Sequence, residues 1–148
     1  MNQPSSTSPA FSLRPGDKID KFEVVQLIAQ GGMSTVWKGY DKLLDRYVVI
    51  KHLHQNPAVV GDAETFRERV RNEIAIQKRL ASSHKNLVKV YELVEDQRGM
   101  FLVMEYVDGP SLDQLMREKP QPMDPRQALG IVGATAMALT AIHKEQVV

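Results

Sequence analysis

Lys51 and Glu73 stand out because each places a charge on a face that the sequence predicts to be apolar. Side chains alternate between the two faces of a strand, so within residues 46–53 Lys51 shares a face with a valine and a leucine. Within residues 66–81, at a helical period of about 100° per residue, Glu73 falls inside the apolar stripe. A buried ammonium requires an anion nearby, and a buried carboxylate requires a cation. The sequence therefore predicts that Lys51 and Glu73 meet, although each alone could also extend past the core edge into water.

A glycine-containing segment precedes this lysine and could lie over phosphate groups. Residues 28–39 read IAQGGMSTVWKG, with Gly31 and Gly32 between two predicted strands. Glycine lets backbone N–H groups approach phosphate oxygens closely and permits a positive φ. In isolation the segment is better explained as a hairpin turn, so its interpretation depends on the residues downstream.

Periodicity and turn signals give the elements that must position these residues. Alternating, β-branched segments predict strands over residues 21–28, 34–41, 46–53, 87–96 and 98–107. Apolar periodicity predicts helices over residues 66–81, 111–119 and 126–145. In the first helix the buried stripe would consist of Phe66, Val70, Ile74, Gln77 and Leu80. A capping box formed by Thr65 and Glu68 would mark its start. Strands grouped early and helices grouped late predict an α+β fold.

Composition excludes several classes of function. The chain has 148 residues and a formal net charge of +1, so neither nucleic acid nor a membrane surface is expected as the main partner. The absence of cysteine excludes disulfides, thiolate metal sites and a cysteine nucleophile, and it is compatible with the reducing cytoplasm, where we expect the protein. No apolar run reaches the ~18 residues of a membrane span. His52 and His54 alternate on one strand without a third ligand, so no metal site is predicted.

With these features in order, the chain resembles the protein kinase family, and most closely bacterial serine/threonine kinases of the eukaryotic type. VVIK at residues 48–51 is similar to the family's strand-lysine motif. SHKNLVKVYEL at residues 83–93 is similar to the stretch after the family's helix glutamate, and LVMEYVDGPSL at residues 102–112 is similar to its hinge. The resemblance covers about residues 20–148. It implies a protein kinase-like fold, in which a five-stranded antiparallel sheet and one helix form the N-lobe and the first helices of the C-lobe follow.

The resemblance implies that the ligand is ATP. Lys51 would bind the α and β phosphates and Glu73 would hold it there, which makes these two the catalytic residues within this chain. The family's G-x-G-x-x-G-x-V pattern falls on Ala29, Gly31, Ser34 and Val36, so only the middle glycine and the valine are kept, and the methyl group of Ala29 is expected to weaken binding. The positions implied to contact ATP are Ile28, Ala29, Gly31, Gly32, Met33, Ser34, Val36, Val49, Lys51, Met104, Glu105, Val107 and Ser111.

Within that set, the resemblance assigns the adenine pocket to side chains of the sheet and the hinge. Ile28, Val36 and Val49 would pack on the adenine, with Met104 as gatekeeper at the back of the pocket. The backbone C=O of Glu105 and N–H of Val107 would bind the adenine edge, and Ser111 would lie near the ribose.

The domain organisation follows from the same comparison. Residues 1–19, rich in Ser, Pro and Thr, would form a disordered tail. Residues 20–107 would form the N-lobe, and residues 108–148 the hinge exit and first two helices of an incomplete C-lobe. The last helix carries apolar residues along one face that the rest of a C-lobe normally covers, so their exposure is expected: Leu129, Val132, Ala136, Leu139 and Ile142.

Two motifs on which kinase chemistry depends, H-R-D-x-x-x-x-N and D-F-G, are absent from the 148 residues. Mg²⁺ is therefore expected only in a full-length form, and no metal ligand is assigned here. Three interpretations stay open. The chain is part of a serine/threonine kinase, truncated before the catalytic loop and inactive alone, whose full-length form phosphorylates protein substrates. Alternatively it is a non-catalytic nucleotide-binding or regulatory module, or an unrelated α+β interaction domain.

Overall fold

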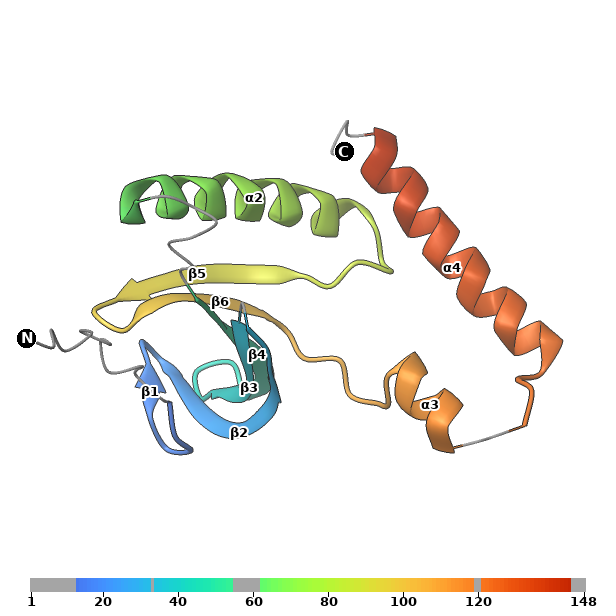
Figure 1. Ribbon diagram of the computed structural model, residues 1–148, viewed down its shortest axis with the longest axis horizontal. Helices are drawn as coiled ribbons and strands as arrows, with labels where there is room; N and C mark the ends of the chain where they lie inside the picture. The colour runs from blue at the N-terminus through green and yellow to red at the C-terminus, as the bar shows by residue number, and fades with distance from the viewer. Residues whose placement is uncertain (1–12, 33, 55–61, 119–120, 145–148) are drawn as a thin grey trace, which may run out of the picture.

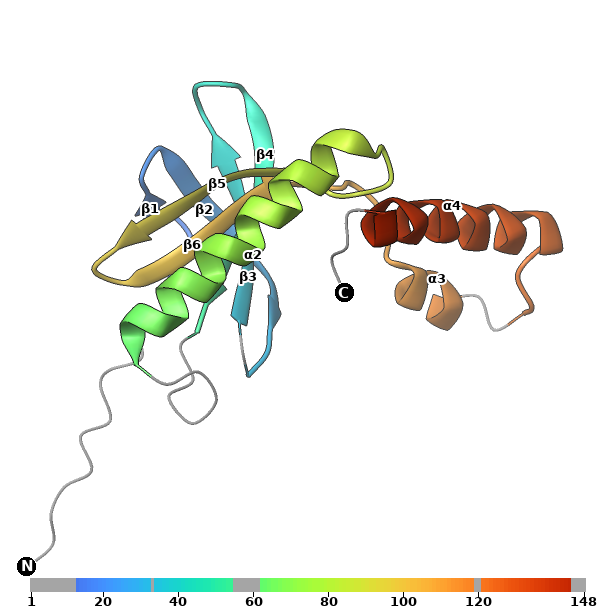
Figure 2. The same ribbon diagram turned by 90° about the horizontal axis from the view of Figure 1, so that it is seen from above.

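The computed structural model describes residues 13–32, 34–54, 62–118 and 121–144 (Figures 1 and 2). Six strands form one antiparallel sheet in the spatial order β1-β2-β3-β4-β6-β5. They are β1 Lys18–Ile19, β2 Phe22–Gln30, β3 Ser34–Asp41, β4 Arg46–Leu53, β5 Val90–Asp96 and β6 Gly99–Glu105. The helices are α2 Ala63–Ser83, α3 Leu112–Glu118 and α4 Pro125–Lys144. Helix α2 lies along β5 and β6 on one face of the sheet, whereas α3 and α4 lie beyond one end of it.

The α+β fold and the five expected strands are confirmed, and β1 is an additional strand at the sheet edge. It pairs with β2 through Lys18↔Glu23 and Ile19↔Phe22. The expected disordered tail is therefore wrong for its last residues, because Leu13 and Ile19 are buried, with 3% and 0% of their surface exposed. Turn residues separate these two apolar side chains, so no periodicity marked them in the sequence. Residues 1–12 of the expected tail lie outside the described residues.

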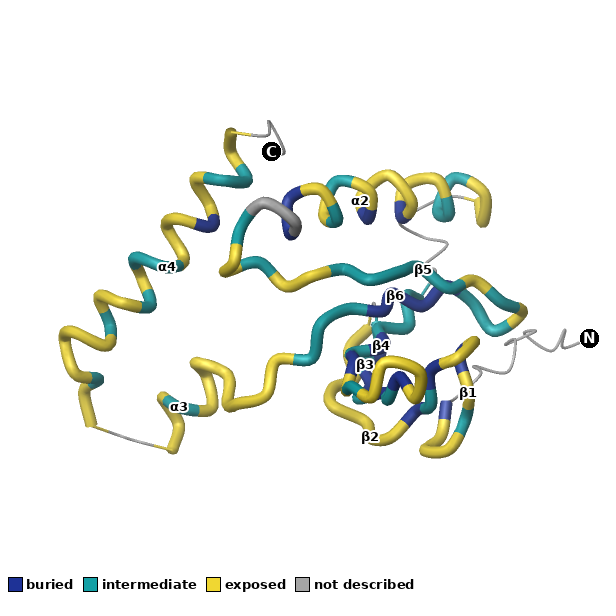
Figure 3. The backbone as a smooth tube through the Cα atoms, turned by 180° about the vertical axis from the view of Figure 1, so that it is seen from behind, coloured by how far each residue is buried: buried dark blue, intermediate teal, exposed yellow. Residues whose placement is uncertain are grey.

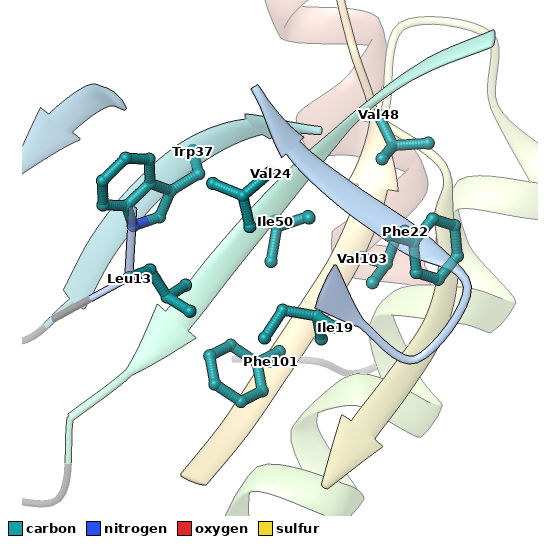
Figure 4. Packing of buried hydrophobic residues seen from close by; sticks show 9 residues of the cluster. All are labelled: Leu13, Ile19, Phe22, Val24, Trp37, Val48, Ile50, Phe101 and Val103. Carbon is teal, nitrogen blue, oxygen red and sulfur yellow. The ribbon is translucent and has the colours of Figure 1, made fainter. Parts of the chain in front are cut away.

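The main hydrophobic core fills the inner side of the curved sheet (Figure 4). Apart from Leu13, its side chains come from β1, β2, β3, β4 and β6, and the cluster consists of Leu13, Ile19, Phe22, Val24, Trp37, Val48, Ile50, Phe101 and Val103. Because side chains alternate along β4, Val48 and Ile50 point into this core while Lys51 and Leu53 lie on the opposite face. The predicted alternation of residues 46–53 is confirmed.

Helix α2 covers that opposite face through a smaller apolar cluster. Val70 and Ile74 pack against Met100 and Leu102 of β6. The N-cap is Asp62, whose carboxylate accepts a hydrogen bond from the Thr65 backbone N–H at 2.8 Å. The capping box predicted at Thr65 is therefore wrong, because an aspartate three residues earlier already satisfies the first turn.

Two arginines of α2 also bind the sheet. Arg67 Nε lies 2.6 Å from Glu95 Oε1, and Arg71 Nη2 lies 2.9 Å from Glu95 Oε2. The Glu95 carboxylate of β5 thus contacts two successive turns of α2. These two contacts favour one position of the helix along β5.

Helices α3 and α4 have much more exposed surface than the sheet (Figure 3). Leu129, Val132 and Leu139 are 73%, 64% and 47% exposed, as the sequence predicted for the last helix. Near its C-terminal end α4 approaches the end of α2, where Asn86 Nδ2 donates to the Ala134 carbonyl oxygen at 3.1 Å and Ala138 is buried. Among the described helices none is long and apolar enough to cross a lipid bilayer.

Candidate functional site

A cleft of about 640 Å³ lies between the sheet, α2 and the end of α4. Its walls are largely apolar, with Phe66, Val70 and Ile74 contributed by α2 and Leu102 by β6. Four residues that the sequence assigned to a site also line it: Ser34, Lys51, Glu73 and Met104. An apolar cavity with a few polar groups is typical of small-molecule sites.

Lys51 and Glu73 face this cleft from different elements. Lys51 lies on β4, between Val36 of β3 and Leu102 of β6 in the strand register, and it is half-buried. Glu73 lies on α2 and is exposed. In the part of the chain that the structure describes, these two side chains form no ion pair, so the predicted meeting is wrong for this structure.

The physical reason is that neither charge is fully removed from water. Val70 and Ile74 set the buried side of α2, and Glu73 lies beside that side at the rim of the cleft. An exposed carboxylate needs no cation, and an ion pair between partly exposed groups contributes little. Glu73 instead extends past the core edge into water, which was the alternative that the sequence left open.

Other strand residues that were predicted to contact ATP lie on the same face of the sheet as Lys51. In the pairing of β3 with β4, Val36 lies opposite Lys51 and Ser34 lies opposite Leu53. In the pairing of β4 with β6, Val49 lies opposite Met104. Since alternate residues of a strand share a face, these side chains surround Lys51 on the side turned toward α2.

Of the predicted residues in the glycine-containing segment, Ser34 lines the cleft, whereas Ile28, Ala29, Gly31 and Gly32 do not. Ile28 and Ala29 are exposed on β2, and Ala29 pairs with Val36 next to an irregularity in the register. Gly31 N–H donates to the Ser34 carbonyl oxygen at 2.9 Å, which closes the turn, and a Cβ on Gly32 would meet nothing within 4 Å. Met33 lies outside the described residues. The described part of the segment thus forms a β-hairpin, with open space around Gly32.

The predicted hinge residues lie at and after the end of β6. Glu105 N–H donates to the Lys89 carbonyl oxygen at 2.8 Å, and the Glu105 carboxylate accepts from Lys89 N–H at 3.1 Å. Val107 is 64% exposed. The Ser111 hydroxyl accepts a hydrogen bond from Gln114 N–H at 3.2 Å, and the Gln114 side chain accepts from Ser111 N–H at 2.7 Å. Ser111 therefore caps α3 in a reciprocal capping box.

Sequence reasoning missed several residues that line the cleft. Leu53 follows Lys51 by two positions, so strand alternation could have included it. Leu87 and Val88 were predicted to begin a strand over residues 87–96 but were assigned to no site, and Ile142 was expected to lie on an exposed face. Ile142 reaches the cleft because α4 leans toward the end of α2, an arrangement that no local pattern encodes.

Two histidines follow Lys51 at the end of β4. The His52 ring stacks on Phe101 at 4.5 Å between centroids, and its Nε2 donates to the Arg98 carbonyl oxygen at 3.2 Å. Burial is the largest cause that lowers the pKa of His52 below 6.5, and the neighbouring His54 lowers it further. Within the described ranges, no three His, Asp or Glu side chains are grouped so that they could hold a metal ion.

Comparisons with known proteins identify the family of this chain. A family model described as "Protein kinase domain" matches residues 22–148. The chain is 34% identical to serine/threonine-protein kinase PrkC of Bacillus subtilis over 128 residues, which cover 86% of this chain and 19% of that protein. It is 37% identical to serine/threonine-protein kinase PknL of Mycobacterium tuberculosis over 124 residues, which cover 84% of this chain and 30% of that protein.

A solved structure gives the same result for the fold. The kinase domain of Mycobacterium tuberculosis PknI superimposes with a TM-score of 0.72 at 27% identity, covering 90% of this chain and 52% of that domain. The chain thus spans less than a third of these curated relatives and about half of the solved kinase domain. The family model and the identity to these curated kinases show that the chain belongs to the protein kinase domain family.

Proposed function

We propose that this chain is the ATP-binding portion of a serine/threonine protein kinase. The observation that carries the proposal is the position of Lys51: a half-buried ammonium at the inner wall of an apolar cleft, in a chain of the protein kinase family. The protein to which these residues belong would transfer the γ-phosphoryl group of ATP to serine or threonine residues of a protein substrate, in the cytoplasm.

The proposed site has a charged part for the phosphates of ATP and an apolar part for its adenine. Lys51 offers a compact positive charge to the α and β phosphates, and the partly desolvated surroundings strengthen that attraction. Val36 and Val49, on the same sheet face, and Met104, at the cleft wall, offer apolar surface to the adenine. Ile28, Ala29, Gly31 and Gly32 do not line the cleft and would cover the nucleotide if the β2–β3 hairpin moves toward it.

Glu105, at the end of β6, and Val107 and Ser111, in the connector that follows, complete the proposed site. The carbonyl oxygen of Glu105 and the N–H of Val107 would bind the adenine edge. Ser111 already caps α3, so we assign it to the ribose end of the site by position only.

The residues of this chain do not fit Mg²⁺. The sequence lacks both kinase motifs that supply metal ligands, and the described residues hold no group of three metal-binding side chains. We therefore propose that these 148 residues alone bind nucleotide weakly and transfer no phosphoryl group. Transfer of ³²P to a protein substrate by the purified chain would contradict this.

A second candidate function is a non-catalytic nucleotide-binding or regulatory kinase-like module. The separation of Glu73 from Lys51 favours it, because the family's active arrangement joins these two groups. An in-frame H-R-D motif after Val148 in the gene would support the kinase, whereas a genuine stop codon there would support the module.

Titration with a fluorescent ATP analogue tests nucleotide binding itself. We expect saturable binding that falls about tenfold in Lys51→Met, because the phosphates lose a charge-assisted contact. Lys18→Met is the matched control, since this exposed lysine lies on the edge strand β1. Equal binding by all three proteins, or no binding by the wild type, would contradict the proposed site.

A further inference from the structure

Beside the proposed nucleotide site, one lysine lies between two tyrosines. Lys38 Nζ lies 3.9 Å from the ring centroid of Tyr47 and 4.4 Å from that of Tyr106. The two rings are 6.1 Å apart, and Tyr40 extends the row with a centroid 5.2 Å from Tyr47. The aromatic rings thus come from β3, β4 and the residue that follows β6.

The strand register explains why these groups meet. Lys38 lies opposite Val49 of β4, and Val49 lies opposite Met104 of β6. Tyr47 precedes Val49 by two positions and Tyr106 follows Met104 by two, so both rings lie on the same sheet face in the next row. Lys38 is therefore a diagonal neighbour of Tyr47 and reaches across β4 to Tyr106.

Tyr106 has a particular place in the chain. It is the first residue after β6, and it begins the connector of residues 106–111 that leads to α3. Its neighbours Glu105 and Val107 carry the backbone groups proposed to bind the adenine edge. Among the described residues Lys38 has no carboxylate partner, so the two rings are the groups that hold its ammonium in place.

We propose that Lys38 is a positioning residue: it binds the faces of Tyr47 and Tyr106, holds the start of the connector against β4, and thereby fixes the backbone of Glu105 and Val107. A cation between two rings suits this task, because the attraction of each ring face is directed and persists where the side chains are partly desolvated. The inference deepens the proposed function and rests on it for the role of the connector in adenine binding.

The first test needs no nucleotide. Hydrogen exchange of the backbone amides in residues 106–112 is measured by mass spectrometry for wild type, Lys38→Met and Lys38→Arg. We expect exchange to be faster by about threefold in Lys38→Met, and restored in Lys38→Arg, since arginine also stacks on aromatic rings. Lys42→Met is the control on the same hairpin, where the lysine binds Glu23 at 2.6 Å. Tyr106→Leu, which removes one ring, should match Lys38→Met.

The second test compares fluorescent analogues of ATP and GTP. The connector is proposed to distinguish adenine from guanine, so Lys38→Met should lower the ATP-to-GTP affinity ratio by about threefold, and Lys38→Arg should restore it. A purely structural loss would weaken both nucleotides equally.

The outcomes separate this inference from the proposed function. Unchanged exchange in residues 106–112 of Lys38→Met overturns the positioning role, whatever the nucleotide data show. Faster exchange with an unchanged affinity ratio overturns it as well. Absence of nucleotide binding by the wild type refutes the proposed function, and hydrogen exchange then still decides whether Lys38 holds the connector.

Discussion

Lys51 of β4 and Glu73 of α2 line the same cleft, and in the described chain they remain separate, without an ion pair between them. Two features hold α2 in this position: Val70 and Ile74 pack against β6, and Glu95 binds two arginines of the helix. Joining the two charges would take a movement of α2 or a new rotamer of Glu73 or Lys51.

We expect Lys51 and Glu73 to act independently in nucleotide binding by this chain. Lys51→Met should weaken binding of a fluorescent ATP analogue about tenfold, whereas Glu73→Gln should change it less than about twofold, because no contact between them is lost. The double variant completes a thermodynamic cycle, and the expected coupling energy is below about 0.5 kcal/mol. A coupling above about 1 kcal/mol would mean that bound nucleotide brings the two groups together.

Glu95 should stabilise the attachment of α2 to the sheet. Glu95→Gln removes the charge from an ion pair with both Arg67 and Arg71, and we expect the free energy of unfolding to fall by about 0.5–1 kcal/mol, a small value because these side chains are partly exposed. Urea denaturation measures it, and the loss should shrink in high salt. Asp113→Asn, which breaks the more exposed pair with Arg117 within α3, is the control and should have a smaller effect.

Stability should fall on mild acidification because of His52. Burial lowers the pKa of His52 in the folded state below its ordinary 6.5, and the nearby His54 adds to this. The unfolded chain then binds a proton before the folded chain does, so the stabilisation is complete above pH 6.5 and is lost as the pH falls through the folded pKa. Asp96, whose own pKa is lowered mainly by Arg98, stays charged in this window.

Thermal unfolding from about pH 7.5 to about pH 5 measures this dependence. His52→Gln should flatten the curve, and His143→Gln, at an exposed position of α4, should leave it unchanged. Equal curves for wild type and His52→Gln would contradict the assignment.

Leu13 should contribute to stability as a core residue although it precedes the first strand. Its side chain is 3% exposed among the residues of the main core, so Leu13→Ala should lower the free energy of unfolding by about 2–4 kcal/mol. Leu43→Ala makes the same chemical change at a side chain that is 80% exposed, and its effect should stay within about 0.5 kcal/mol. Similar values for the two variants would place Leu13 outside the core.

The sequence predicted the sheet well where strand alternation and turn residues agree. The strands over residues 34–41 and 46–53 have the predicted bounds, and the burial of Val48 and Ile50 follows the predicted face. Strand β1 was missed because two residues are too few to show a period. Ile19 of β1, and Leu13 before it, join the main core through tertiary contacts that no local pattern predicts.

For the site, periodicity predicted the approximate face of each residue. It did not predict which residues at the edge of a helix face are buried and which remain in water. Glu73 was assigned to the apolar stripe from its angle alone, yet Val70 and Ile74 occupy the inner side of α2 and leave Glu73 at the rim. The contact of Lys38 with Tyr106 joins residues of β3 and the connector, and only the pairing of three strands makes it visible.

Both hydrophobic clusters described above draw their members from residues 13–104. Both clusters of the described residues therefore lie before α3, whereas most of the surface of α3 and α4 is exposed to solvent. We therefore expect a chimera that joins residues 1–107 to the remaining lobe of another kinase to keep both clusters on the N-terminal side of the junction.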